Sequence, residues 1–128
     1  MKLQVICPDR IFYDGEVSLV ELTTTEGEIG VYPRHIPLTG ILAPGVMAIT
    51  ENSQMKIAAV HSGFVQILPE KVTVMAEVAE WPDEIDLDRA QAAKERAQER
   101  MKAKDNSTDI ARAETALQRA MARINTLK

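Results

Sequence analysis

Apolar and polar residues alternate along the first part of the chain, between Lys2 and Ala79. The alternation is clear in five segments: 2–7, 17–22, 55–60, 64–68 and 72–78. A period of two places successive side chains on opposite faces of a strand. Turn-forming pairs such as Asp14-Gly15 and Pro44-Gly45 interrupt the runs every ~8–12 residues, which is typical of an antiparallel sandwich or barrel. Because no helical segment separates the strands, a parallel sheet is not expected.

The pattern changes at Trp81-Pro82, and the chain beyond this point has the periodicity of helices. No Gly or Pro follows Pro82, whereas Ala, Arg, Glu, Gln and Lys are abundant. Asp86 is placed to cap a first helix. Its inward stripe consists of Ala90, Ala93, Ala97 and Met101. A second stripe, spaced alternately by three and four, consists of Ile110, Ala113, Leu117, Ala120, Ile124 and Leu127. The polar stretch 105–108 separates the stripes, so we expect an antiparallel helical hairpin.

The two periodicities predict an α+β protein with two domains. Residues 1–83 are expected to form an all-β antiparallel sandwich or barrel, and residues 84–128 a two-helix antiparallel hairpin. A seam rich in alanine buries little area, so at ~25 cal/mol per Å² docking of the hairpin is worth only a few kcal/mol. We therefore expect a stable sandwich and a movable hairpin.

Charge divides the chain at the same place as periodicity. Residues 1–83 contain 5 basic and 11 acidic residues, and residues 84–128 contain 10 basic and 8 acidic residues. This asymmetry indicates two modules with different partners, and the net charge of −4 argues against nucleic acid. No apolar run approaches the ~20 residues of a membrane span, and a secretory signal is lacking. The single cysteine, Cys7, lies in an apolar alternation and is interpreted as a small packed side chain.

The sequence contains no recognisable catalytic constellation. HExxH, paired CxxC and G-x-S-x-G motifs are lacking, and the histidines are His35 and His61. His35 lies in a Pro-flanked segment, where a locally hydrogen-bonded loop residue is favoured over a catalytic or ligand role. Residues 26–30 contain a G-x-x-G fragment without the Lys-Ser/Thr pair of a P-loop, so we interpret them as a surface loop between strands. An enzyme is the least favoured interpretation.

Two rows of arginines follow the predicted helices, each with spacings of seven and four. They are Arg89, Arg96 and Arg100 on the first helix, and Arg112, Arg119 and Arg123 on the second. Such spacing places each set on one face of its helix. The rows fit either a solvated surface with local salt bridges, or two facing rows that hold a polyphosphate or an acidic helix.

Several separated segments resemble the epsilon subunit of F-type ATP synthases. GEIGVYPRHIPL (27–38) and LAPGVMAI (42–49) are similar to a loop–strand signature of that family, and HSGFVQI (61–67) and VTVMAE (72–77) to its later paired strands. IDLDRA (85–90) matches the I/L-D-x-x-R-A element of members whose hairpin binds ATP. The resemblance covers the full chain, with the segments in the same order.

The resemblance implies a non-catalytic rotor subunit in the central stalk, coupling proton translocation to ATP synthesis. The sandwich would bind the gamma subunit and the polar loops of the c-subunit ring. Glu28 would lie in a loop facing the ring, with Tyr32 and His35 in the adjoining segment. The hairpin would switch between a folded state and an extended state that inhibits ATP hydrolysis by the alpha/beta catalytic head. The subunit would lie at the cytoplasmic face of the bacterial plasma membrane, attached peripherally through the complex.

The same resemblance implies ATP as a regulatory ligand, with no metal required. The implied ATP contacts are Glu80, Ile85, Asp86, Arg89, Ala90, Arg96, Arg119 and Arg123. In the extended state, Arg112, Arg119 and Arg123 would face an acidic loop of the beta subunit instead. The alternative is a stand-alone ligand-binding β-sandwich adaptor with a helical self-association tail. Composition does not separate the two hypotheses, whereas the order of the motifs favours the rotor subunit.

Overall fold

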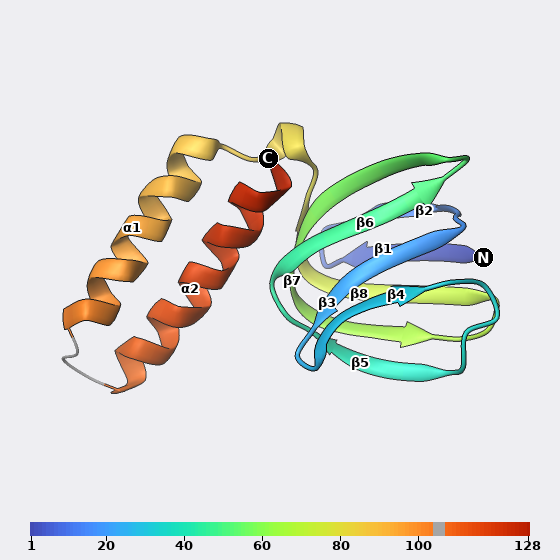
Figure 1. The fold of residues 1–128 in the computed structure, drawn as a ribbon, viewed down its shortest axis with the longest axis horizontal. Coiled ribbons are helices and arrows are strands. Elements are labelled where there is room, and N and C mark those ends of the chain that lie inside the picture. Colours follow the sequence, from blue (N-terminus) through green and yellow to red (C-terminus); the bar gives the residue numbers. More distant parts are fainter. Residues whose placement is uncertain (104–106) are drawn as a thin grey trace.

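The computed structural model describes residues 1–103 and 107–128, and the side chains of 1–103 and 110–128. Within them, a β-sandwich is followed by two helices, which confirms the predicted architecture. The strands are β1 (Lys2–Cys7), β2 (Arg10–Glu16), β3 (Leu19–Thr24), β4 (Gly27–Val31), β5 (Leu38–Leu42), β6 (Gly45–Glu51), β7 (Gln54–Ile67) and β8 (Lys71–Glu80). The helices are η1 (Pro82–Glu84), α1 (Leu87–Ala103) and α2 (Ser107–Thr126). Figure 1 shows α2 lying between α1 and the sandwich.

The core of the sandwich lies between two layers of strands and follows the predicted alternation. Its side chains with no exposed area are Leu3, Val5, Val20, Val31, Ile49, Ala58, Val65, Ile67, Val72 and Val74. Along β8, for example, Val72 and Val74 are buried while Thr73 and Met75 are partly or largely exposed. Burial of one face of each strand supplies most of the driving force for this fold.

β7 joins the two layers of the sandwich. Its first part pairs with β6 and its last part pairs with β5. Between the two parts the backbone kinks, with positive φ at Ser62 (24°) and Gly63 (148°). A β-carbon at position 63 would clash with the carbonyl oxygen of Met75 on the neighbouring strand, so the kink requires glycine.

One pair of strands contradicts the expectation of an entirely antiparallel sheet. β1 and β8 run parallel, from Lys2 opposite Lys71 to Ile6 opposite Met75. The other ladders of the described residues are antiparallel. No crossover helix is needed, because the six intervening strands bring the chain back to the start of β1. The prediction considered only neighbouring runs, and this contact joins the first and last strands of the sandwich.

The predicted surface loop at residues 26–30 is also wrong. Residues 27–31 form β4, which pairs with β3 through Leu22 opposite Ile29 and Val20 opposite Val31. The hydroxyl of Thr24 closes a tight turn before β4, since it accepts the Glu26 N–H at 3.1 Å and donates to the Gly27 carbonyl at 2.8 Å. The connection is therefore shorter than expected.

The hairpin begins at the predicted cap. Oδ1 of Asp86 accepts the backbone N–H of Arg89 at 3.1 Å, at the start of α1. The seam between the helices buries Ala90, Ala97, Ala113 and Ala120, all within the predicted stripes. The predicted break at 105–108 is shorter in the structure, because α2 already includes 107 and 108; residues 105 and 106 lie outside the described residues.

A second face of α2, not expected from the sequence, packs against β6 and β7. Ala122 and Thr126 are buried on α2 although neither belongs to the seam between the helices. The Thr126 hydroxyl donates to the Ala122 carbonyl at 2.8 Å, which satisfies its polar group in this dry environment. The main docking contacts of the hairpin on the sandwich are therefore those of α2.

Candidate functional site

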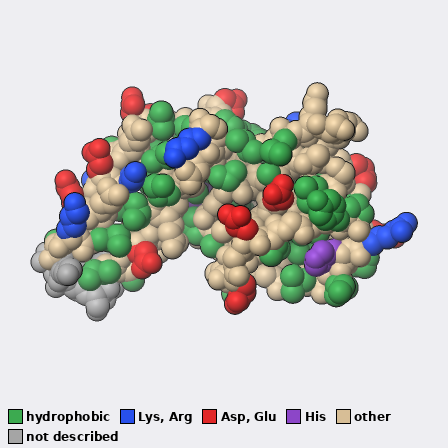
Figure 2. Space-filling model, viewed as in Figure 1, with side chains coloured by type: hydrophobic (Ala, Val, Ile, Leu, Met, Phe, Trp, Pro, Cys, Tyr) green, Lys and Arg blue, Asp and Glu red, His purple; other side chains and the backbone are tan. Residues whose placement is uncertain are grey.

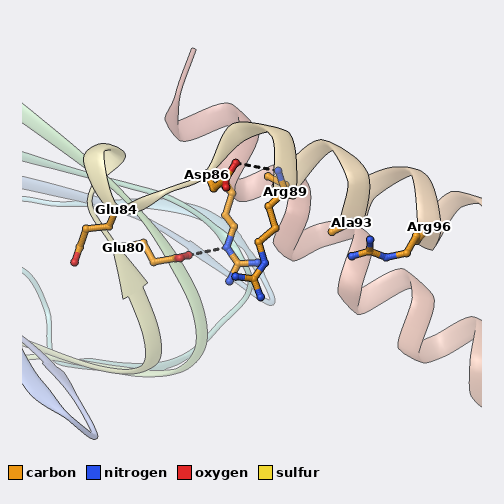
Figure 3. A pocket seen from close by; sticks show the side chains of 8 residues that line it. Glu80, Glu84, Asp86, Arg89, Ala93 and Arg96 are labelled. Atoms are coloured by element: carbon orange, nitrogen blue, oxygen red, sulfur yellow. Dashed lines mark hydrogen bonds and ion pairs between the residues drawn. The ribbon is translucent and has the colours of Figure 1, made fainter.

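A polar cavity of about 340 Å³ lies where the end of β8, the η1 turn and the two helices meet. It is lined by Glu80, Glu84, Asp86, Arg89, Ala90, Ala93, Arg96 and Arg123. Glu80 is the last residue of β8, Asp86 caps α1, and the arginines project from α1 and α2. Figure 3 shows Glu80 and Arg89 directed toward the same space between the sandwich and the hairpin.

The cavity brings together six of the eight residues that the sequence resemblance implied: Glu80, Asp86, Arg89, Ala90, Arg96 and Arg123. Ile85 and Arg119 do not line it. Two further lining residues, Glu84 and Ala93, were missed. Ala93 follows Ala90 by three residues on the same face of α1, a spacing that could have identified it. Glu84 carries no such signal, because the η1 turn alone places it.

Glu80 joins both parts of the molecule at this site. Its Oε1 accepts Arg123 Nε at 2.7 Å, and the same oxygen lies 3.2 Å from Nε2 of His61. His61 is buried in β7, whereas Glu80 and Arg123 are partly buried. One carboxylate oxygen of Glu80 is thus shared by two nitrogen partners. The Glu80–Arg123 ion pair therefore ties α2 to the edge of the sandwich.

His61 stays neutral under ordinary conditions. Burial lowers the pKa of His61, because the charged imidazolium would lose its hydration. The hydrogen bond with Glu80 acts in the opposite direction, while the positive charges of Arg123 and Arg119 lower the pKa further. The histidine thus serves as a buried partner of Glu80.

Arg119 contacts the sandwich outside the cavity. Its Nη2 donates to Oγ of Ser62 at 3.2 Å and lies 3.9 Å from Oε2 of Glu77. Ser62 is the kinked residue of β7 with φ of 24°, and the kink directs its hydroxyl toward α2. In this arrangement Arg119 contacts the strand and does not line the cavity.

The remaining cations of the cavity are available to an anion. Among the described side chains, neither Arg89 nor Arg96 has a carboxylate within ion-pair distance. Guanidinium groups offer paired N–H donors that fit phosphate and carboxylate groups. The acids of the lining lie on the sandwich and linker side, at Glu80, Glu84 and Asp86. The cavity is therefore polarised, with donors on the helices and acceptors beside the sandwich.

The described residues were compared with the patterns of metal sites and of membrane-spanning helices. Among the side chains of residues 1–103 and 110–128, no three from His, Cys, Asp or Glu lie together as metal ligands would. Neither described helix is long and apolar enough to cross a membrane.

The predicted partner contacts lie in two separate places. Tyr32 is 62% exposed and His35 is half-buried, with Nδ1 of His35 2.8 Å from the Ile36 carbonyl oxygen. Their connection, from β4 to β5, lies at the end of the sandwich away from the hairpin (Figure 1). Glu28 is exposed on β4 rather than in a loop. Arg112 is exposed on α2, whereas Arg119 and Arg123 contact the sandwich.

Lys and Arg side chains gather over the helical half of the face shown in Figure 2, while Asp and Glu side chains lie over both halves. The fold and the site together define a class of two-part interaction modules, in which a β-sandwich carries a docked helical hairpin and the two share one polar cavity. Comparison with known proteins identifies a family with this arrangement.

Residues 1–82 match the family model described as "ATP synthase, Delta/Epsilon chain, beta-sandwich domain", and residues 83–128 match "ATP synthase, Delta/Epsilon chain, long alpha-helix domain". The chain belongs to the delta/epsilon chain family of ATP synthases. The resemblance to epsilon subunits is thereby confirmed, and with it the prediction of a non-catalytic synthase subunit. Membership also favours the rotor subunit over the stand-alone adaptor.

Similar proteins of known name span the whole chain. The ATP synthase epsilon chain of Halalkalibacterium halodurans is 43% identical over 98% of this chain and 95% of its own length. That of Caldanaerobacter subterraneus subsp. tengcongensis is 44% identical over 95% of this chain and 89% of its own length. These relatives are bacterial, which agrees with the predicted source of the complex.

Solved structures show the same fold at lower identity. A chain of the Euglena gracilis mitochondrial ATP synthase (OSCP/F1/c-ring, rotational state 1) matches with a TM-score of 0.86 and 22% identity, covering 98% of this chain and 80% of that chain. A chain of the Tetrahymena thermophila mitochondrial ATP synthase central stalk/c-ring matches with a TM-score of 0.67 and 14% identity, covering 99% and 96%.

Proposed function

We propose that this chain is the epsilon-type subunit of a bacterial ATP synthase, and that its hairpin binds ATP when folded on the sandwich and inhibits ATP hydrolysis when extended. The observation that carries the proposal is the convergence of Arg89, Arg96 and Arg123 with Glu80 and Asp86 around one cavity. Sandwich, linker and both helices all contribute, so the site exists only while the hairpin is folded.

The polarity of the cavity fits a nucleoside triphosphate. The guanidinium groups of Arg89 and Arg96, which form no ion pair with the described side chains, offer donors for phosphate oxygens. Glu80 and Asp86 offer acceptors for the amino group of a base or for sugar hydroxyls. A volume of about 340 Å³ lies within the range of small-molecule sites.

Binding to the folded state alone would couple ATP concentration to hairpin position. A ligand at 100 times its Kd stabilises the state it binds by about 2.7 kcal/mol. Docking of an alanine-rich hairpin is worth a comparable few kcal/mol, so ATP at such concentrations shifts the population substantially. Release would free Arg119 and Arg123 from Glu77 and Glu80, and these cations with Arg112 would then face an acidic loop of the beta subunit.

An exposed apolar row on the outer face of the sandwich supports association with the gamma subunit. Adjacent strands align its members in the order Ile11, Ile6, Met75, Phe64 and Ile41. All but Ile6, which is half-buried, are at least 43% exposed. Contiguous exposed apolar side chains of this kind mark interaction surfaces.

The opposite end of the sandwich from the hairpin is the proposed contact with the c-subunit ring. Exposed Tyr32 and Ile36 lie there beside His35 in the connection from β4 to β5. Glu28, on the preceding strand, would contribute a charge to this contact. Such contacts would hold the subunit peripherally at the cytoplasmic face of the membrane through the complex.

Calorimetric titration of the full chain with ATP tests the nucleotide site. Arg89→Ala and Arg96→Ala are expected to weaken binding by about tenfold each, the effect of losing one charge-assisted contact. Arg100→Ala on the same helix serves as the control, because Arg100 does not line the cavity. Equal affinity in all four proteins would contradict the proposal.

Inhibition is tested separately. The full chain and a version ending at Asp83 are each reconstituted with a matching catalytic head, and ATP hydrolysis is measured. The hairpin is expected to lower the rate, and added ATP at millimolar concentration to relieve the effect. Equal rates for the two versions would remove the regulatory role and leave subunit association untouched.

A further inference from the structure

The junction between sandwich and hairpin is a closed turn formed by residues 81–84. The Glu84 N–H donates to the Trp81 carbonyl at 3.0 Å, and the Trp81 N–H donates to Oε1 of Glu84 at 2.9 Å. Glu84 therefore caps the turn in which it lies. The turn ends at Ile85, which has an extended backbone (φ −99°, ψ 129°).

Arg10, the first residue of β2, holds this turn from the sandwich. Its Nη1 donates to Oε2 of Glu84 and its Nη2 to Oε1, both at 2.9 Å. Nη2 also donates to the Ala79 carbonyl at 3.1 Å, near the end of β8. The hydrogen bonds from Arg10, followed by that from the Trp81 N–H, lower the pKa of Glu84. We call the pair of hydrogen bonds from Arg10 to the Glu84 carboxylate the Arg10–Glu84 clamp.

Aromatic packing also holds the turn. The ring of Trp81 stacks on Phe12, with centroids 4.2 Å apart and an angle of 18° between the planes. The Arg10 guanidinium carbon lies 5.0 Å from the centroid of the same Phe12 ring. Arg10, Phe12 and Trp81 thus form one layered stack that fixes the linker to β2 by both polar and apolar contacts.

The chain has no comparable attachment immediately beyond Glu84. Among the described residues, the hydrogen bonds of Ile85 and Asp86 remain within residues 82–90: Ile85 N–H to the Pro82 carbonyl, and Asp86 to the N–H groups of Arg89 and Ala90. In the described part of the chain, the main packing partner of α1 is α2. The attached and unattached parts of the linker therefore meet at Ile85.

We propose that Arg10 is a positioning residue for the nucleotide site, which confines hairpin movement to Ile85 and Asp86 and keeps the Glu80–Glu84 wall of the cavity fixed to the sandwich. The inference rests on the proposed function, since it requires a hairpin that moves and a cavity that binds ATP. Arg10 does not line the cavity. Figure 3 shows the Glu84 carboxylate directed away from Arg89 and Arg96, so Arg10 acts through the position of the turn and not through the ligand.

Amide hydrogen exchange in the full chain tests the clamp without any ligand. Arg10→Ala is expected to accelerate exchange at the Trp81 and Ile85 amides by about tenfold, because the turn that contains their acceptors, Glu84 and Pro82, loses its anchor at Glu84. Amides of β7 and β8 are expected to keep their rates, which also verifies that the sandwich stays folded. Lys2→Ala, which removes the same charge from an exposed position on β1, is the control. Unchanged exchange at Trp81 and Ile85 would overturn the proposal.

A double-mutant cycle tests the link to the cavity. Arg10→Ala is expected to weaken ATP binding about threefold to tenfold in the full chain, and to have little effect when Glu84→Ala is already present. Arg10→Lys, which retains the charge but not the fork, should fall between the two. An effect of Arg10→Ala that is the same in both backgrounds would overturn the positioning role. If ATP does not bind the unmodified chain, the proposed function fails, and the exchange rates still decide whether the clamp exists.

Discussion

Arg123 on α2 donates to Glu80 at the end of β8 at 2.7 Å, across the boundary between the hairpin and the sandwich. The two residues are 43 positions apart in the chain, and the same carboxylate oxygen also contacts buried His61. One acidic side chain is therefore shared by the docking contact of the hairpin and the candidate nucleotide site. Changes at Glu80 are expected to alter both properties together.

Replacing Glu80 by Gln is expected to loosen the hairpin. The amide keeps the shape of the side chain but loses the charge that holds Arg123, so docking should weaken by about 1–2 kcal/mol. Amide exchange in α2, between residues 110 and 126, should accelerate while the sandwich remains protected. Glu70→Gln, at an exposed site outside the contact, is the control. Unchanged exchange in α2 would show that the ion pair contributes nothing to docking.

The stability of the folded chain is expected to fall on mild acidification because of His61. Burial lowers the pKa of His61 from its ordinary value of 6.5, so the unfolded chain takes up a proton at a higher pH than the folded chain. The free energy of unfolding should therefore decrease as the pH falls from the pKa of His61 in the unfolded chain to its lower pKa in the folded chain. Below the pKa of the folded state it should level off.

His61→Gln is expected to flatten this part of the profile, since glutamine can still contact Glu80 but does not titrate. The profile is obtained from denaturant unfolding at several pH values between neutrality and the range in which carboxylates protonate. An identical slope in the variant would assign the pH dependence to other groups.

Filling the cavity is expected to block the ligand without changing any charge. Ala93 lines the cavity and is only half-buried, so Ala93→Leu should fit the helix while occupying the space beside Arg89 and Arg96. We expect loss of ATP binding by at least about tenfold with little change in thermal stability. Gln91→Leu, exposed on the same helix, should bind normally. Normal binding by Ala93→Leu would place the ligand elsewhere.

The kink in β7 is expected to be intolerant of any side chain. Gly63→Ala would combine a φ of 148° with a clash against the Met75 carbonyl, at a cost of about 2–4 kcal/mol in the free energy of unfolding. Gly30→Ala, whose β-carbon would meet nothing closer than 3.8 Å, should cost less than about 1 kcal/mol. Denaturant unfolding of the two variants measures the difference, and equal stabilities would contradict the assignment.

Local chemistry explains which features could be predicted from the sequence. Alternation along the strands reflects burial of one strand face, and the alanine stripes reflect the helical period, so both domains were recognisable. The cap at Asp86 depends on residues three apart and was equally visible. Six of the eight cavity residues were implied by the resemblance to a known family, three of them within residues 85–90, and this signal needs no knowledge of the fold.

The predictions that the structure contradicts share one cause, which is contact between residues far apart in the chain. β4 was assigned to a loop because its glycines masked a short strand, whose partner β3 supplies the ordering contacts. The parallel pair of β1 and β8 joins strands from opposite ends of the sandwich. In each case a contact distant in the chain decided the outcome.

The amino-acid sequence alone therefore determined the two periodicities, the change of pattern at Pro82 and the family, because these depend on residue types and on spacings of a few positions. Only the tertiary structure decided that Glu80 meets His61 and Arg123, and that Arg10 holds Glu84. Such contacts join strands and helices that are up to 74 positions apart. They form where folding brings the side chains together, and no local sequence pattern indicates which of them will meet.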